Sequence, residues 1–503
     1  MEETTKPTEY TVLFPFCGIG AGALGFLQAR AKLCGLDARF RSLGGIDNDP
    51  DACRDFEALT ASPALCTDVG EMSTEDLRAF CPECPDVVFS SPPCKPNSRL
   101  MSNRVAKTAR YQRMQRLIVD WLQLVFETYS KRPKLILIEN VPGITSRGRE
   151  LLAEIKELLA REGYVYDEGM HQCGELGGLA QLRTRYLLVA RRPKDVPPLL
   201  YKPPKLRVRG CGEVVGLLPL PDNGEGGAMH TMPKLSWLNW IRLALIPAGG
   251  DWRDLPGVLE GKARREVFQR YRIEDWDQPT FCVDGPGTNG TYGVADVRVK
   301  SARNGAYGVR GWKAPSRTIT GSANVDNGPF AVADPRLPIK TGFDHAYRVL
   351  KWEEPSFTVA GKTHPGCGAY TVADPRTKAA ATVHGDDGAP VRIPDIKKRP
   401  KTPPVLIGED GTWHRPFTPL ELAVLQGLPA TVNGEPLQLT GRKRDGWCER
   451  IGNAVPVGTA KAIATQMLVT LVHAAVEGFA LSTTPVWVDR DAPSLDHHHA
   501  AMH

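Results

Sequence analysis

Short apolar runs alternate with segments of helical periodicity between residues 11 and 192. The apolar runs predict strands over residues 11–16, 40–47, 86–91, 134–139 and 185–191. The intervening periodicity predicts helices over residues 21–33, 50–58, 108–130 and 147–162. Because strands and helices alternate, we expect a parallel sheet covered by helices on both faces.

Two proline-rich stretches, residues 193–204 and 390–404, divide the rest of the chain and fit linkers around a middle region. After the second stretch, Thr418 as N-cap, Pro419 at the first helical position and Glu421 at the third form a capping box, which predicts a helix start. A last helix is predicted over residues 457–478.

The middle region contains an internal repeat near residues 271–298, 307–336 and 347–376. Each copy has a Tyr followed five residues later by a Trp, and ends in Val-Ala-Asp-x-Arg. The copies are rich in Gly, Pro, Thr and Val, which favours short strands and turns. Each Tyr and Trp fits a core anchor between small β units, whereas the loops of successive units are candidates for contact with DNA bases.

Composition sets mild limits on the class of protein. The chain has 503 residues, a net charge of +6 and a pI of about 8.6, which suits a nucleic-acid partner without requiring one. We expect no membrane role, because no apolar run approaches the roughly 18–20 residues of a span. The N-terminus is polar and acidic, unlike a signal peptide, so we expect the cytoplasm. Residues 479–503 fit a flexible tail.

The twelve cysteines are scattered along the chain, which favours reduced thiols over a disulfide framework. Cys81 and Cys84 form one CxxC pair, but no second pair follows at the spacing of zinc ligands. We therefore expect no metal site.

Candidate ligand-binding residues follow the first three strands. Residues 16–22 (FCGIGAG) form a glycine-rich turn that lets backbone N–H groups approach a ligand. Asp47 and Asn48 end the second strand, where a carboxylate can bind ribose hydroxyls. Asp68 would end a third strand and could accept a hydrogen bond from an adenine amine. Taken separately, each acid also fits a solvated loop.

The segment 86–98 (DVVFSSPPCKPNS) carries a candidate nucleophile, Cys94, into a proline-framed loop at the carboxyl edge of the sheet. A free cysteine is mostly protonated at pH 7, and neighbouring positive charge, such as that of Lys95, is expected to lower its pKa. Seven Lys or Arg and no acid lie between Lys95 and Arg116. They fit either a solvated helix face or, directly after a nucleophile, a phosphate contact.

The next strand ends in Glu139 and is expected beside the segment that carries Cys94. Partial burial there would favour the protonated carboxyl and make it a proton donor. Arg183 and Arg185 alternate at the start of the following strand, so both can face one side and grip a carbonyl oxygen or a phosphate.

In this order, the motifs resemble those of the DNA cytosine-5 methyltransferases. The matching segments are residues 16–20, Asp47, Asp68, 92–94, 139–141, 181–185, 420–429 and 452–456. The resemblance implies an α/β, Rossmann-like S-adenosylmethionine-dependent methyltransferase sheet with an inserted, β-rich, repeat-containing target recognition domain. It assigns the discontinuous catalytic domain to residues 10–192 and 415–478, and target recognition to residues 193–414.

The resemblance also implies a mechanism. A cytosine is swung out of duplex DNA, and Cys94 adds to its C6. Glu139 protonates N3, Arg183 and Arg185 stabilise the O2 side, and C5 takes the methyl group. The implied cofactor is S-adenosylmethionine, and its product is S-adenosylhomocysteine. The residues implied to line its pocket are Phe16, Gly18, Gly20, Asp47, Asn48, Asp68, Val69, Pro93, Asn453 and Val455. The implied DNA contacts are Lys95, Ser98, Arg99 and Arg104.

Three features depart from the family pattern. Lys95 stands where Gln is usual, Phe14 replaces an acid, and the middle region is long and repeated. The alternatives are an RNA (tRNA) cytosine-5 methyltransferase, a catalytically inactive DNA-binding homologue, and transfer of an unusual group from a modified cofactor. We further expect a prokaryotic or phage-encoded monomer, with a cognate restriction endonuclease acting separately.

Overall fold

The computed structural model describes residues 7–94 without Cys34, Asn97, residues 108–245 without Pro197 and Leu199, residues 399–404 and residues 413–476. The other described segments are the short strands β11 (Tyr271–Glu274), β12 (Thr291–Val294), β13 (Val309–Gly311), β14 (Ser316–Arg317), β16 (Ala331–Asp334) and β20 (Trp487–Val488). The implied DNA contacts 95, 98, 99 and 104 and the third repeat therefore lie outside the described residues.

An eight-stranded sheet is the framework of the first half of the chain. Its strands are β1 (Thr8–Pro15), β2 (Arg30–Leu33), β3 (Leu36–Asp47), β4 (Ala64–Cys66), β5 (Val87–Ser90), β6 (Leu135–Asn140), β7 (Val165–Gln172) and β9 (Thr184–Arg191). They lie in the order β2-β3-β1-β5-β6-β9-β7. The first residues of β3 pair with β2, and its carboxyl end pairs with β4.

The strand order reverses between β1 and β5. From β1 the chain moves outward to β3 and β4 on one side, and then returns to β5 and β6 on the other. Loops that follow the carboxyl ends of β1 and β5 diverge at such a switch point and leave a crevice, where open α/β sheets bind their ligands. The glycine-rich turn follows β1 and Cys94 follows β5, so both lie at this crevice.

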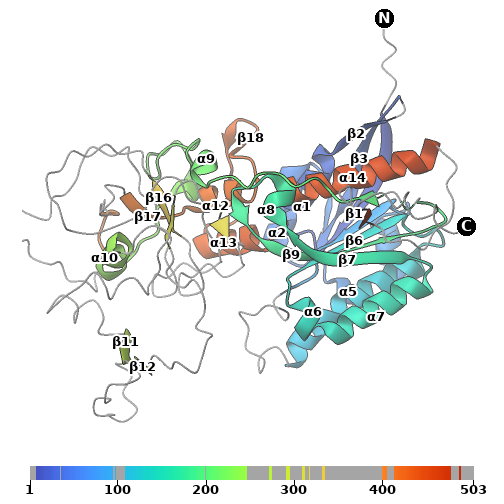
Figure 1. The fold of residues 1–503 in the computed structure, drawn as a ribbon, viewed down its shortest axis with the longest axis horizontal. Coiled ribbons are helices and arrows are strands. Elements are labelled where there is room, and N and C mark those ends of the chain that lie inside the picture. Colours follow the sequence, from blue (N-terminus) through green and yellow to red (C-terminus); the bar gives the residue numbers. More distant parts are fainter. Residues whose placement is uncertain are drawn as a thin grey trace, which may run out of the picture.

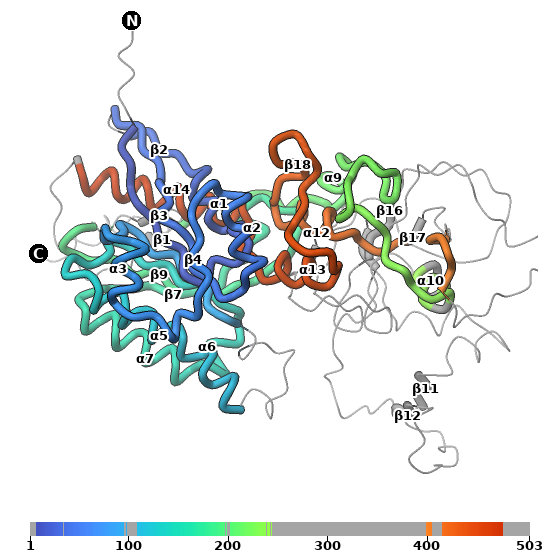
Figure 2. Tube along the Cα trace, turned by 180° about the vertical axis from the view of Figure 1, so that it is seen from behind, coloured from blue at the N-terminus to red at the C-terminus, as the bar shows by residue number. Residues whose placement is uncertain are grey.

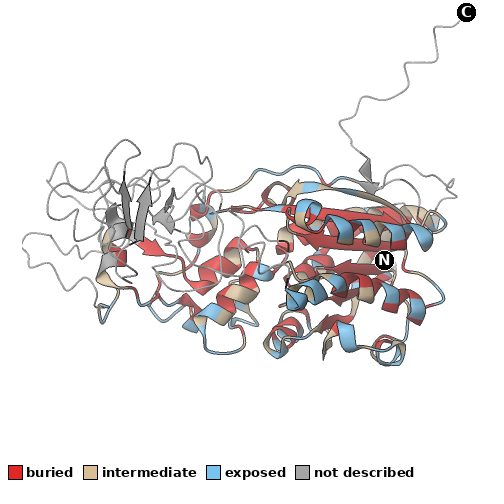
Figure 3. Cartoon of the chain, turned by 90° about the horizontal axis from the view of Figure 1, so that it is seen from below, coloured by how far each residue is buried: buried red, intermediate tan, exposed pale blue. Residues whose placement is uncertain are grey.

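Alternate residues of the central strands point into two separate cores. Val12 and Phe14 pack on one face of the sheet, while Leu13 packs on the other, as the period of a strand requires. Helices α1 and α14 cover the first face, and α5 and α7 the second (Figure 1). The buried strands between the half-exposed helices are seen in Figure 3. The helices of this half are α1 (Ala21–Gln28), α2 (Pro50–Thr60), η1 (Val69–Glu71), α3 (Thr74–Phe80), α5 (Ala109–Thr128), α6 (Ile144–Arg147), α7 (Arg149–Arg161) and α8 (Cys173–Gly177).

The expectation of an all-parallel sheet was wrong at both edges. β9 runs antiparallel to β6 and to β7, and β2 runs antiparallel to β3. The predicted helix 21–33 was also too long: α1 ends at Gln28, and residues 30–33 form β2. Residues 30–33 form a strand because burial alternates along this segment: Ala29 and Ala31 are buried, whereas Arg30 and Lys32 face solvent. Such a period of two is typical of a strand and not of a helix.

A second group of elements lies beside the sheet, toward the carboxyl ends of its central strands (Figure 2). It combines segments from both sides of the middle region: α12 contacts α9 and η3, and α10 contacts β17. The members are β8 (Gln181–Leu182), α9 (Gly212–Val215), η3 (Ala228–His230), α10 (Trp237–Leu245), β17 (Trp413–Pro416), α12 (Pro419–Leu425), β18 (Thr431–Val432), β19 (Glu435–Pro436) and α13 (Arg444–Asn453). The strand β10 (Leu200–Tyr201) instead contacts α14 and pairs with β20.

The described parts of the first two repeats contain short strands, as the composition predicted. In the first repeat β11 pairs with β12, and in the second β13 pairs with β16, in both cases in parallel. β16 also pairs with β17, which joins the second repeat to the segment leading into α12.

The last helix, α14 (Val457–Val476), returns to the sheet and packs on α1, β2 and β3. One helical stretch, Arg444–Ala475, is long and apolar enough to cross a membrane by length and composition alone, and most of its apolar window is buried in the fold. The expectation that no apolar run approaches this length was therefore wrong. Within α14, the buried side chains Met467, Leu468 and Leu471 belong to the core of the first face.

A fully buried ion pair holds the start of α12. The predicted capping box of Thr418 and Glu421 is confirmed, and Arg415 donates to both carboxylate oxygens of Glu421 at 2.9 and 2.7 Å. His230 contacts the Thr418 hydroxyl at 2.8 Å, which ties η3 to the same cap. Burial alone would raise the pKa of Glu421, but the charge and hydrogen bonds of Arg415 hold it at about 2.

We predict that Glu421→Gln lowers the free energy of unfolding by about 3–5 kcal/mol, because it leaves the Arg415 charge buried without its partner. Urea unfolding at pH 7 measures the change. Glu213→Gln removes an exposed partner of Arg207 and is the matched control, with an expected loss below about 1 kcal/mol. Equal losses in the two variants would contradict the prediction. With a folded pKa of about 2, the contribution is present above pH 4.5 and is lost as the pH falls toward 2.

Candidate active site

The turn after β1 is shaped for close approach of a ligand. Phe16, Gly18 and Gly20 have φ of +54°, +51° and +82°, a left-handed conformation that glycine adopts without strain. A Cβ atom on Gly18 would meet no other atom within 4 Å, so one side of the turn is open. A Cβ atom on Gly20 would lie 2.9 Å from the Phe56 ring, so this glycine lets the turn sit on α2.

Asp47 holds this turn in place. One carboxylate oxygen accepts the Gly18 N–H at 2.9 Å, and the other accepts the Asp49 N–H at 3.0 Å. Burial raises the pKa of Asp47, although these backbone hydrogen bonds oppose the rise. The observed contacts therefore make Asp47 an organiser of the loop, while its binding of ribose stays a prediction. Asn48 beside it is exposed.

The other predicted cofactor residues surround the same region of the sheet. Asp68 accepts the Gly70 N–H at 2.9 Å and caps η1, which begins at the buried Val69. From the far end of the chain, Asn453 ends α13 with its side chain exposed, and Val455 follows it, buried in the core of the first face. An open glycine turn backed by a carboxylate, with a second carboxylate one strand away, fits a ligand that contains an adenosine.

Cys94 lies four residues beyond the end of β5 and is half-buried. Its carbonyl accepts the Asn97 N–H at 3.0 Å, which folds the chain back directly after the thiol. The charges of Arg185, Glu139 and Arg183 are all close enough to act on the thiol. The structure thus brings together the four residues that the sequence predicted to be catalytic.

Glu139 is buried at the end of β6 and is fully engaged by its neighbours. Its Oε1 pairs with Arg185 Nε at 2.8 Å, and its Oε2 accepts a hydrogen bond from the Ser91 hydroxyl at 2.8 Å. The pair forms because β9 runs antiparallel to β6, so the start of β9 lies beside the end of β6. Arg185 also donates to the Thr184 carbonyl at 2.9 Å, which orients its guanidinium.

Arg183 makes contacts that differ from the prediction. Its guanidinium is almost fully buried and donates to the carbonyls of Gly452 at 3.1 Å and Ala454 at 2.9 Å. These contacts join the start of β9 to the segment that carries Asn453. Burial, and then the charge of Arg185, lower the pKa of Arg183 to about 9, so it is charged at neutral pH.

The expectation that positive neighbours lower the pKa of Cys94 was wrong in its net direction. Burial is the largest influence and raises the pKa of Cys94, because a thiolate loses solvation inside the protein. Arg185 and Arg183 oppose the rise, while Glu139 adds to it. The sequence pointed to Lys95, which lies outside the described residues, and could not reveal the loss of solvent around the sulfur.

Four polar residues of the site escaped the sequence analysis: Ser91, Asn97, Gln115 and Asn140. Ser91 binds Glu139, and Asn97 contacts the side chains of Gln115 and Asn140. Asn140 directly follows Glu139, and Ser91 precedes Cys94 by three residues. For these two residues, the position beside a catalytic motif was the one sign in the sequence that they belong to the site.

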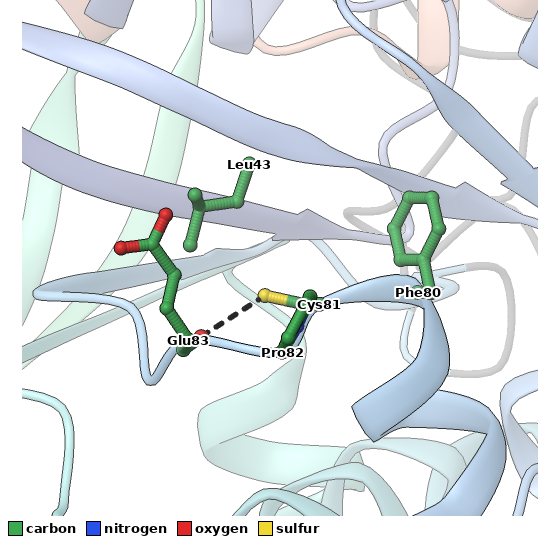
Figure 4. Close-up of a pocket in the computed structure, with 5 residues that line it drawn as sticks. All are labelled: Leu43, Phe80, Cys81, Pro82 and Glu83. Carbon is green, nitrogen blue, oxygen red and sulfur yellow. Dashed lines mark hydrogen bonds between the residues drawn. The ribbon is translucent and has the colours of Figure 1, made fainter.

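The Cys81/Cys84 pair lies at the other edge of the sheet, just before β5 begins. Cys81 lines a surface pocket with Leu43, Phe80, Pro82 and Glu83 (Figure 4). Its thiol donates to the Glu83 carbonyl at 3.2 Å, and the Cys84 thiol donates to the Lys131 carbonyl at 3.0 Å. Within the described part of the chain, no group of three or more His, Cys, Asp or Glu side chains is arranged to hold a metal ion.

Comparisons with known proteins show what the chain is similar to. A model of the C-5 cytosine-specific DNA methylase family matches residues 11–207. Type II methyltransferase M.NgoFVII of Neisseria gonorrhoeae is 22% identical over 292 residues, which cover 56% of this chain and 71% of that protein. Type II methyltransferase M.BbvI of Brevibacillus brevis is 26% identical over 291 residues, which cover 55% and 75%. A solved methyltransferase of Entamoeba histolytica, EhMeth, aligns with a TM-score of 0.49 at 14% identity over 94% of this chain and all of that one.

The reversed strand order, with its glycine turn and cysteine loop at one crevice, defines an α/β enzyme of the Rossmann-like methyltransferase class. Residues 11–207 belong to the C-5 cytosine-specific DNA methylase family, and the Type II methyltransferases are relatives over somewhat more than half of the chain. The chain is accordingly a DNA cytosine methyltransferase, and its family implies S-adenosylmethionine as the methyl donor.

We predict that the rate at which iodoacetamide alkylates Cys94 continues to rise with pH above the pH at which the rate for an ordinary thiol becomes constant. A raised pKa leaves the thiol protonated at pH 7, so its thiolate fraction grows about tenfold per pH unit up to that raised pKa. Mass spectrometry of the peptide containing Cys94 measures the rate, with a small free thiol as comparator. Arg185→Gln should slow alkylation further at each pH. A rate that becomes constant at the same pH as that of the free thiol, or at a lower pH, would contradict the raised pKa.

Proposed function

We propose that this enzyme methylates C5 of a cytosine flipped out of duplex DNA, through a covalent bond between Cys94 and C6 of the base. The observation that carries the proposal is the placement of Cys94 within range of the buried Glu139–Arg185 ion pair, at the switch point of the sheet. A base within a duplex cannot present its ring carbons to such a recessed thiol, so the cytosine must leave the stack.

Each step assigns one task to the residues of the site. Cys94 loses its proton to water and its sulfur bonds to C6, while a proton moves from Glu139 to N3, so that C5 becomes nucleophilic. S-adenosylmethionine, when bound, supplies the methyl group that C5 takes up. A base then removes the C5 proton, the electrons reform the C5–C6 double bond, and the sulfur leaves as thiolate. Glu139 regains its proton from N3.

The ion pair and its neighbours orient this proton transfer. Arg185 and Ser91 each hold one oxygen of Glu139, which fixes the plane of the carboxyl group relative to the base. We assign Arg185 to the O2 side of the cytosine, as the sequence predicted. Arg183 is assigned to positioning instead, because its guanidinium donates to the Gly452 and Ala454 carbonyls.

The cofactor would be held by the residues around the open turn after β1. The backbone of the turn, organised by Asp47, would receive the amino-acid part, with Asp47 and Asn48 near the ribose and Asp68 near the adenine. Pro93, in the nucleophile loop, and Asn453 with Val455, from the chain's other end, would complete the pocket. Arg183 supports this assignment, since it anchors both sides of Asn453.

We assign residues 10–192 and 415–478 to one catalytic domain and residues 193–414 to target recognition. The packing of α14 on α1 supports the first assignment, because a Cβ atom on Gly25 of α1 would lie 2.5 Å from the Val457 carbonyl. Double-stranded DNA is the partner, and Lys95, Ser98, Arg99 and Arg104 are proposed phosphate contacts. A monomeric state, a separate endonuclease and a prokaryotic cytoplasm stay predictions; the first two relatives are named Type II methyltransferases and come from bacteria.

We predict that cells expressing the protein acquire 5-methylcytosine within one DNA motif, and that Cys94→Ser lowers this activity by at least about 1,000-fold. Bisulfite sequencing reports the base and the motif together. Binding of cofactor and DNA should change little, since the substitution replaces one atom. Cys84→Ser, which alters a half-buried thiol at the opposite edge, is the matched control. Near-normal turnover by Cys94→Ser would disprove the nucleophile, and methylation of tRNA in place of DNA would favour the RNA alternative.

We predict that deletion of residues 271–298, the first repeat, changes or abolishes the methylated motif while cofactor affinity stays within about twofold. Its described strands, β11 and β12, pair with each other and with no other described strand, so the sheet of the catalytic domain is untouched. Calorimetric titration with S-adenosylmethionine and sequencing of methylated DNA measure the two properties. An unchanged motif would remove the first repeat from target recognition.

A further inference from the structure

Asn97 is a buried amide directly behind the nucleophile. Only 1% of its surface is exposed, although it lies three residues after Cys94 in a loop segment. Asparagine is seldom buried to this extent unless its polar atoms are bonded, because an unpaired buried amide costs about 1–3 kcal/mol. Its backbone N–H donates to the Cys94 carbonyl at 3.0 Å, so the position of Asn97 sets the direction in which the chain leaves the thiol.

The Asn97 side chain connects two elements that flank the site. Its Oδ1 accepts the Gln115 Nε2 group of α5 at 2.8 Å, and its Nδ2 lies 3.5 Å from Asn140 Oδ1 at the end of β6. Asn140 Oδ1 also accepts the Val141 N–H at 2.9 Å, which fixes that acceptor. The first contact is a strong hydrogen bond and the second a long one.

Two glycines allow the backbone of Asn97 to press against the turn that follows Glu139. A Cβ atom on Gly143 would lie 1.9 Å from the Asn97 carbonyl oxygen, and one on Gly148 would lie 2.9 Å from Asn97 Oδ1. The first distance is far inside contact, so any larger residue at 143 must displace the loop or the turn. The absence of a side chain at Gly143 and Gly148 therefore permits the close approach of Asn97.

We propose that Asn97 is a positioning residue, which holds the Cys94 loop against the strand end that carries Glu139. The inference rests on the proposed function, in which both groups act on one base. Strand pairing aligns β5 with β6 as far as Ser90 and Ile138, and Cys94 lies beyond that register. The contacts of Asn97 with Gln115, Asn140 and Gly143 supply the alignment that strand pairing does not. Loss of about 1 Å in such an alignment can cost about 100-fold in rate.

Three variants test the same contact from different sides. Asn97→Ala removes the amide, Gln115→Ala removes the donor on α5, and Gly143→Ala pushes on the Asn97 carbonyl. Gln123→Ala is the matched control, since Gln123 is an exposed glutamine of the same helix. The half-buried Gln115 keeps the test usable if Asn97→Ala fails to fold.

The readout is the rate of covalent adduct formation with a duplex that carries 5-fluorocytosine in the methylated motif. Fluorine at C5 blocks the final elimination and traps the Cys94 bond. We expect adduct formation and kcat to fall about 10–100-fold in the three variants. KM for DNA and cofactor affinity should stay near the values of Gln123→Ala, and Tm, measured beside them, shows that each variant is folded.

Wild-type adduct rates in Asn97→Ala and Gln115→Ala would overturn the inference, as would a parallel loss of cofactor affinity, which would indicate a merely structural role. A wild-type protein that forms no adduct, or an adduct that persists in Cys94→Ser, would instead overturn the proposed function and the inference with it.

Discussion

The buried ion pair between Glu139 and Arg185 is the interaction on which the site depends. A carboxylate that is only 5% exposed loses several kcal/mol of solvation, which a close guanidinium must offset. Arg185 can reach Glu139 only because β9 runs antiparallel to β6. In a parallel β9 the same residue would start at the opposite edge of the sheet. The reversed strand, which the sequence analysis missed, is therefore what places a positive charge beside both the acid and the thiol.

The same reversal brings together segments from the two ends of the chain. Arg183, two residues before Arg185, binds the carbonyls of the segment around Asn453. On the other side of that segment, Arg450 of α13 pairs with the buried Asp55 of α2 at 3.0 Å, and α2 begins just after Asp47. The segment around Asn453 is thus held on one side by Arg183 and on the other by α2, although Arg450 and Asp55 are nearly 400 positions apart in the sequence. These contacts, and not the proline-rich stretches, fix the geometry of the two parts relative to each other.

Predictions from sequence succeeded where a single strand carries the signal. Cys94 and Glu139 each follow or end a continuous apolar run, and Asp47 ends a strand of mixed composition. Their meeting at one edge followed from the sheet alone. β7 was missed because its sequence, VYDEGMHQ, is polar and its residues are mostly half-exposed. The raised pKa of Cys94 and the role of Asn97 depend on tertiary packing: Gln115 and Asn140 are far from Asn97 in sequence, and no local pattern announces their contact.

The charges around Cys94 act on its thiol in opposite directions. Burial raises the pKa of Cys94 and the charge of Glu139 raises it further, while Arg185 and Arg183 lower it. Arg185 also pairs with Glu139 at 2.8 Å, so one guanidinium stabilises the carboxylate and acts on the thiol at the same time. The proposed mechanism asks Cys94 to lose a proton while Glu139 gives one to N3 of the cytosine. Under that proposal the flipped base, which brings N3 to Glu139, must be in place for both transfers, so that the thiol reacts mainly when its target is bound.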